Sequence, residues 1–170
     1  MFGCENTEQE LAELSSNRIG VEEGKDIIIN YSTEGSTKAR LIGPVMRRYQ
    51  DSGNYVEFPK GVHGDFFGAA LQVETTLDAR FARYTETESK VFLKDSVKLI
   101  NTKGDTLYCS ELYWDRNRKG MEFFTDKPIR IRTKEYIFDG EGLDAPQDFR
   151  SWHIVKPTGF MKVKSSEFPN

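Results

Sequence analysis

The sequence is poor in the residues that form disulfides, bind metals or carry out catalysis. It contains two cysteines, Cys4 and Cys109, and two histidines, His63 and His153. A disulfide framework needs several paired cysteines and is not expected here. The histidines are far apart and show no ligand spacing, which argues against a metal site. Cys109 falls within an apparent strand and is interpreted as a small buried hydrophobic residue rather than a nucleophile.

Basic stripes and long apolar runs are missing as well. The net charge is −3 and the pI is about 5.5, so no nucleic-acid partner is expected. No apolar run approaches the roughly 18 residues of a membrane-spanning helix. Asp115, Asp139 and Glu141 stand near turns or strand ends, where solvated carboxylates are common, rather than in an acid–base pair. The sequence therefore predicts no catalytic residue, no cofactor and no metal, and the protein is not expected to be an enzyme.

Aromatic residues and period-two alternation are abundant. The 12 Phe, 7 Tyr and 2 Trp argue against disorder. Apolar and polar residues alternate from Leu71 to Phe81, as in a long strand with one apolar face and one wet face. Glu34-Gly35 and Lys103-Gly104 supply turns for hairpins, because glycine tolerates the positive φ that such turns need. An all-β chain follows.

The predicted hairpins repeat along the chain. "VEFPKGV", "VFLKDSV" and "EFFTDKPI" each place an apolar pair before a polar turn that holds a lysine. The strands that follow begin at intervals of about 32–35 residues, which indicates a stacked array of one supersecondary unit. We expect an elongated antiparallel array with two sheets packed face to face over residues 24–164. Residues 1–23 are expected to form a flexible polar tether, and residues 165–170 a tail.

Inward positions on the alternating strands are the candidate ligand-binding residues. They share apolar character and lie on the face opposite the charged residues: Leu71, Val73, Leu77, Phe81, Val97, Leu99, Ile129 and Ile131. A dry core that binds nothing is the alternative for each of them. Arg130, Arg132 and Lys134 face the other way, and we interpret them as solvated surface, with phosphate binding as the alternative.

Several segments together resemble the LptC family of the lipopolysaccharide export machine, in its Bacteroidetes-type branch. The resemblance covers about residues 26–160 and is carried by "VEFPKGV", "LDARFARY", "KVFLKDSVKLINTKGDTLYCSELYWD", "FFTDKPIRI" and "FDGEGLDAPQDFRSWHI". It implies a twisted β-jellyroll with a groove between its sheets and no catalytic motif. It also implies that lipopolysaccharide is received from an inner-membrane ABC transporter and passed to a periplasmic bridge protein of similar fold.

The same resemblance implies a periplasmic protein held at the inner membrane. Many family members carry an N-terminal membrane helix. Here Cys4, which follows Gly3 and precedes a polar stretch, is expected to carry a lipid anchor in its place, unless the anchor is a segment missing from this sequence.

Two non-enzymatic alternatives remain open. A hairpin array leaves unpaired strand edges at both ends, so the chain could be a scaffold that joins other β-proteins without touching lipid. Tyr108, Tyr113 and Trp114 could instead present aromatic faces to sugar rings in a carbohydrate-binding sandwich.

Overall fold

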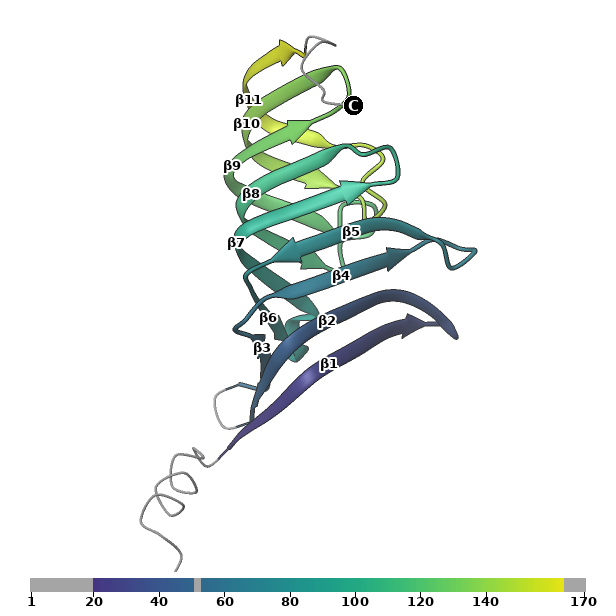
Figure 1. Ribbon diagram of the computed structural model, residues 1–170, viewed down its shortest axis with the longest axis vertical. Helices are drawn as coiled ribbons and strands as arrows, with labels where there is room; N and C mark the ends of the chain where they lie inside the picture. The colour runs from purple at the N-terminus through teal and green to yellow at the C-terminus, as the bar shows by residue number, and fades with distance from the viewer. Residues whose placement is uncertain (1–19, 51–52, 164–170) are drawn as a thin grey trace, which may run out of the picture.

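The computed structural model describes residues 20–50 and 53–163, which form one antiparallel β-sheet (Figure 1). Only one short 3₁₀ helix, Glu86–Glu88, interrupts the strands in these residues. The all-β, elongated and antiparallel prediction is confirmed. The strands are β1 (Val21–Thr33), β2 (Ser36–Tyr49), β3 (Tyr55–Phe58), β4 (Val62–Phe67), β5 (Val73–Ala79), β6 (Phe81–Thr85), β7 (Lys90–Asn101), β8 (Thr106–Asp115), β9 (Phe123–Arg132), β10 (Tyr136–Ala145) and β11 (His153–Lys162).

The two facing layers belong to one sheet, because two long strands run through both. Residues 39–42 of β2 pair with β4, whereas its residues 47–49 pair with β3. Likewise, residues 98–101 of β7 pair with β5 and residues 90–94 pair with β6. We call the half that contains β4 and β5 wall A and the half that contains β3 and β6 wall B. The predicted pair of sheets is thus one sheet folded over.

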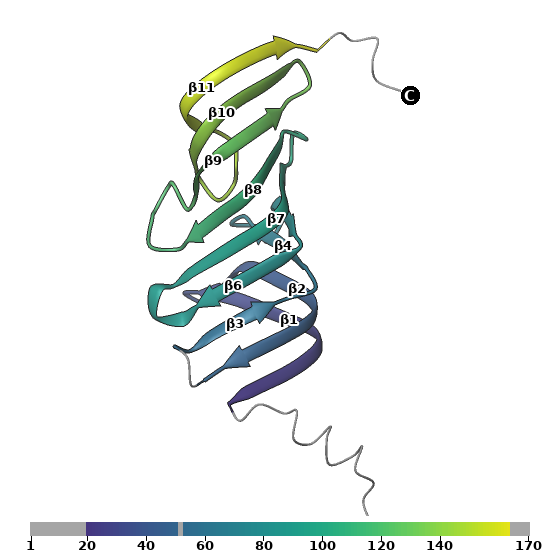
Figure 2. The ribbon, with the colours of Figure 1, turned by 90° about the vertical axis from the view of Figure 1, so that its left-hand side faces the viewer.

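The fold in the sheet follows a line of irregular backbone, the corner line. Residues 59–61 separate β3 from β4, and Arg80 separates β5 from β6. Where the same line crosses the continuous strands β1, β7 and β10, the residues with positive φ are Asp26, Asp95, Ser96 and Gly142. Register shifts accompany those in β7 and β10. Bulges of this kind bend a strand and increase its twist. The strands therefore curve round one side of the molecule, on the left in Figure 1 and facing the viewer in Figure 2.

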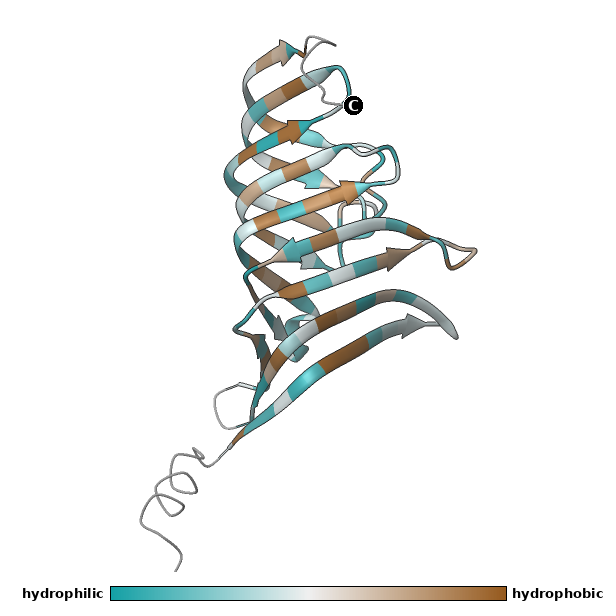
Figure 3. Cartoon of the chain, in the orientation of Figure 1, coloured by the Kyte–Doolittle hydropathy of each residue, from teal (hydrophilic) through white to brown (hydrophobic). Residues whose placement is uncertain are grey.

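The alternation of residue types builds an apolar inner face between the walls. Figure 3 shows hydrophobic and hydrophilic residues alternating along the strands. One inner row crosses wall A from β1 to β11 through directly paired residues: Ile29, Leu41, Gly64, Leu77, Leu99, Leu107, Ile131, Phe138 and Phe160. Its central leucines and Ile131 are fully buried. The buried core thus extends from β2 to β10, and apolar residues of the same face continue onto β1 and β11.

The ends of the domain differ a little from the prediction. β1 begins at Val21, inside the segment predicted to be a tether. Cys4 and the predicted tail, residues 165–170, lie outside the described residues. Within residues 20–50 and 53–163, no helix has the length and apolar character needed to cross a membrane.

Candidate functional site

The interior between the walls is the candidate site, and it contains most of the predicted ligand-binding residues. Leu77, Val97, Leu99, Ile129 and Ile131 are all buried in the same hydrophobic cluster. They come from β5, β7 and β9, whose residues pair across wall A. The alternation of residue types therefore placed these side chains correctly, while their contact with a ligand stays a prediction.

Leu71 and Val73 do not face the interior as predicted. Leu71 lies in the turn before β5 with a φ of 60°, and its side chain is 59% exposed. Val73 is the first residue of β5, at the rim of the wall, and is also exposed. The observed strand β5 therefore begins at Val73, two positions after the predicted start at Leu71. The cause is a turn that follows Gly68, whose N–H donates to the carbonyl of Gln72.

Phe81 points outward, so the prediction that it lines the interior is wrong. The corner at Arg80 breaks the strand that the alternation predicted to be continuous. Ala79 and Ala82 are both buried although they are three residues apart, so the alternation changes phase between them. The Phe81 ring instead lies near the guanidinium of Arg83, at 6.0 Å from the ring centre.

Aromatic side chains close the mouth, the side of the interior opposite the corner line. Trp114 on wall B makes edge-to-face contacts with two rings of wall A, Tyr31 at 6.1 Å and Phe66 at 4.9 Å between ring centres. Phe66 also meets Phe123 of wall B at 5.1 Å. Such pairs add stability beyond the apolar area that they bury. At this place side chains of the two walls are in contact across the interior.

The same contacts argue against the predicted stacking of Tyr108, Tyr113 and Trp114 on sugar rings. Trp114 is buried, and its indole cannot stack on a sugar ring. Tyr113 is half-buried and stacks on Phe124, with ring centres 5.1 Å apart and planes 16° apart, so one of its faces is covered. Of the three aromatic residues, Tyr108 alone is exposed.

Apolar side chains remain uncovered at the two ends of the stack. At the last strand, Phe160 ends the inner row of wall A and is 74% exposed, and Met161 beside it is exposed as well. At the first strand, Ile27 and Ile29 are only partly buried against the core. In the described part of the chain, β1 pairs with β2 alone and β11 with β10 alone. Each terminal strand thus has one edge on which backbone groups can accept a further strand.

The outer face of wall A carries paired charges. Arg130 donates two hydrogen bonds to the carboxylate of Asp139, at 2.7 and 3.0 Å. This hydrogen bond lowers the pKa of Asp139 and raises that of Arg130. Arg130 thus has a partner within the sheet, as expected for a charged surface, and its position on the outer face keeps it away from the interior.

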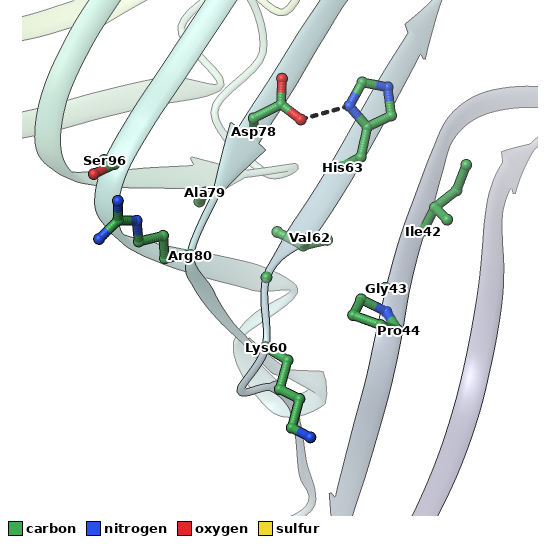
Figure 4. Close-up of a pocket in the computed structure, with 11 residues that line it drawn as sticks. Ile42, Gly43, Pro44, Lys60, Val62, His63, Asp78, Ala79, Arg80 and Ser96 are labelled. Atoms are coloured by element: carbon green, nitrogen blue, oxygen red, sulfur yellow. Dashed lines mark hydrogen bonds and ion pairs between the residues drawn. The ribbon is translucent and has the colours of Figure 1, made fainter.

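A hollow of about 740 Å³ lies where the corner line crosses β2, β4 and β5 (Figure 4). His63 and Asp78 lie together on one side of it, joined by a 2.7 Å hydrogen bond through Nδ1, while His63 Nε2 is 3.2 Å from Asp65. Ser96 lies near Arg80, away from His63. Because both ring nitrogens of His63 already face carboxylates, this arrangement provides no free general base beside a nucleophile.

We expect His63 to stabilise the fold most at low pH. Burial opposes its protonation, but the hydrogen bonds and charges of Asp78 and Asp65 outweigh burial and raise its pKa above 6.5. The stabilisation is then fully present below pH 6.5 and is lost as pH rises through the higher folded-state pKa. Because the pair is partly exposed, we expect less than about 1 kcal/mol. Melting curves from pH 5.5 to 9 should show His63→Gln approaching the parent protein as pH rises.

The control for this experiment removes the partner of His63. In an Asp78→Asn background, His63→Gln should give a much smaller change with pH. An equal loss of melting temperature at pH 5.5 and pH 9 in the single variant would contradict the assigned ion pair.

Other reactive groups are few in the described part of the chain. Burial raises the pKa of the Cys109 thiol to about 12, so this thiol is protonated at neutral pH and is a poor nucleophile. Within residues 20–50 and 53–163, no three His, Cys, Asp or Glu side chains are grouped so that they could hold a metal ion.

Comparisons with known proteins show a partial likeness to a solved structure. No protein-family model and no curated protein matches the chain. Among solved structures, it is similar to the crystal structure of LptH from Pseudomonas aeruginosa, described as the LptA homologous periplasmic component of the conserved lipopolysaccharide transport device. The sequences are 23% identical, the match covers 56% of this chain and 65% of LptH, and the TM-score is 0.42.

Proposed function

We propose that this protein carries lipopolysaccharide without chemical change. In this proposal it receives the lipid from an inner-membrane ABC transporter and passes it to a periplasmic bridge protein of similar fold. The resemblance of its segments to the LptC family supports this role. The proposed location is the periplasmic face of the inner membrane, held there by a lipid on Cys4 or by a segment outside this sequence.

The observation that carries the proposal is the apolar inner row from Ile29 on β1 to Phe160 on β11. Each CH₂ group of an acyl chain costs about 0.8 kcal/mol when it is exposed to water. An apolar face that continues through every strand of wall A can remove that cost along the whole length of the domain. Lipid chains would lie along this face, between the walls.

The ends of the stack support transfer to a protein of similar fold. Phe160 and Met161 are exposed apolar residues beside the free edge of β11. A partner strand added to that edge would form backbone hydrogen bonds and cover these side chains. The inner face would then continue from one protein into the next.

The test places a photocrosslinking amino acid, p-benzoylphenylalanine, on the inner or the outer face of wall A. Phe138 is suitable because it is partly buried in the inner row, so a larger ring can be accommodated there. Tyr108 is the matched aromatic position on the outer face, where it is exposed. With purified lipopolysaccharide, we expect lipid adducts at position 138 and few or none at position 108.

Other outcomes would support the alternatives. Adducts at position 108 with deacylated saccharide would favour sugar binding. Crosslinks to proteins at β1 and β11, with no lipid adduct at position 138, would favour the scaffold and overturn the transfer proposal.

A further inference from the structure

The loop between β10 and β11, residues 146–152, crosses the mouth of the interior, and we call it the strap. It leaves wall B after Ala145 and returns to wall B at His153. Its side chains and backbone nevertheless bond to β5 and β7 of wall A. Figure 1 shows this loop on the side opposite the corner line. The strap therefore bridges the two walls at the place where a ligand would have to enter from the side.

Gln147 attaches the first part of the strap. Its Oε1 accepts a hydrogen bond from Nε1 of Trp114, at 3.3 Å, and its Nε2 donates to the carbonyl of Lys38 at 3.4 Å. Its backbone N–H donates to the carboxylate of Glu122 at 3.0 Å. One residue thus connects β2, β8 and the segment before β9.

Arg150 and Phe149 attach the second part. Nη2 of Arg150 is 2.9 Å from Oε1 of Glu74 on β5. The side chain of Asn101, at the end of β7, donates to the carbonyl of Phe149 at 2.8 Å. The bond from Asn101 to Phe149 is buried, whereas the Arg150 side chain is 60% exposed. An ion pair with such an exposed partner is weak.

Phe149 itself closes the interior. Its side chain is 0% exposed and belongs to the hydrophobic core, although it comes from a loop. Its φ is 48°, a conformation that is unfavourable for a bulky side chain and persists only where the surroundings hold it. The strap therefore holds an apolar ring in the interior in an unfavourable backbone conformation.

A buried polar group beside the strap has no partner. Oγ1 of Thr75 has no hydrogen-bond partner in the described part of the chain, and Thr75 is 1% exposed. Thr75 pairs directly with Asn101, the residue that bonds to Phe149. An unsatisfied buried hydroxyl is unfavourable, and a ligand oxygen could accept its hydrogen bond.

We propose that the strap is a displaceable closure and that Phe149 occupies the position of an acyl chain of the bound lipid. This inference rests on the proposed function and adds the regulation of the same interior. Lipid entry breaks the contacts of Gln147 and Arg150 at the rim, releases Phe149 from its unfavourable φ, and fills its place with an acyl chain. The Thr75 hydroxyl then donates to an ester or hydroxyl oxygen of that lipid.

Hydrogen–deuterium exchange of the full chain tests the movement of the strap, with lipid binding measured in the same samples. Purified lipopolysaccharide is the probe, and crosslinking from p-benzoylphenylalanine at position 138 reports its binding. We expect faster exchange in a peptide that spans the strap when lipopolysaccharide is added. Exchange in residues 106–115 of β8, which lie within the wall, should stay unchanged or become slower.

Two variants with predicted opposite effects make the test sharper. Arg150→Ala removes the ion pair between the strap and Glu74, together with the contact to Asp148 inside the strap. We expect lipid adducts at position 138 to form about 2–5 times faster. Arg130→Ala is its matched control, because Arg130 also pairs with a carboxylate and its side chain is similarly exposed, at 58% against 60%.

Thr75→Val keeps the shape of the side chain and should weaken lipid binding about 2–10-fold, without lowering the unfolding midpoint.

The outcomes separate the two proposals. Lipid adducts at position 138 without faster exchange in the strap, and with equal rates for Arg150→Ala and Arg130→Ala, would overturn the closure and leave the carrier function standing. An absence of lipid adducts in the parent chain and in Arg150→Ala would overturn both.

Discussion

Replacing Leu99 by alanine is expected to lower the free energy of unfolding by about 2–5 kcal/mol. Leu99 is 0% exposed and lies in the middle of the inner row, between Leu77 and Leu107 on the neighbouring strands. Because Leu99 is surrounded by the buried core cluster, the interior cannot collapse fully around the missing atoms, and a cavity remains. Urea unfolding followed by circular dichroism measures the change.

Leu71→Ala is the matched control for Leu99→Ala. It deletes the same atoms from a leucine in an exposed turn, where we expect a change within about 0.5 kcal/mol. Equal losses from the two variants would show that the interior around Leu99 is not tightly packed. That result would contradict the closed conformation from which the strap proposal starts.

Replacing Gly142 by alanine is expected to cost about 2–4 kcal/mol, from backbone strain and steric overlap together. Gly142 lies on the corner line with a φ of 79°. A Cβ atom at this position would lie 2.9 Å from Cβ of Val155 on β11. The bend of β10 and its pairing with the last strand should both be disturbed, which urea unfolding would record as a lower midpoint.

Gly120→Ala separates the two contributions to this loss. Gly120 has the same φ of 79°, but no atom lies within 4 Å of the position of its Cβ. The backbone strain is therefore common to both variants, and we expect about 1–2 kcal/mol for Gly120→Ala. If the two losses were the same, close packing of the last strand against the corner line would not contribute to stability.

Local patterns in the sequence predicted the faces of single strands well. Val97, Leu99, Ile129 and Ile131 were placed inside because strands expose alternate side chains on opposite faces. The turn at Glu34-Gly35 was also found, and both residues have positive φ. These features depend on neighbours in the chain, so they can be predicted without knowledge of the tertiary structure.

The same pattern failed where the sheet bends. Ala79, Arg80 and Phe81 continue the alternation of apolar and charged residues, yet Arg80 is the corner and Phe81 lies outside. Asp95 and Ser96 at the corner of β7 are not glycines, so the sequence carried little signal for their positive φ. A bend that is imposed by packing of the whole sheet is not encoded in the period of one strand.

By itself, the sequence determined that this chain forms hairpins with one apolar face each, because alternation and turn residues act over a few positions. Only the tertiary structure decided that the hairpins join in a single folded sheet and that residues 146–152 close its mouth. The bond from Gln147 to the carbonyl of Lys38 joins residues 109 positions apart. Such contacts depend on which strands lie side by side, and this is settled by packing of the complete chain.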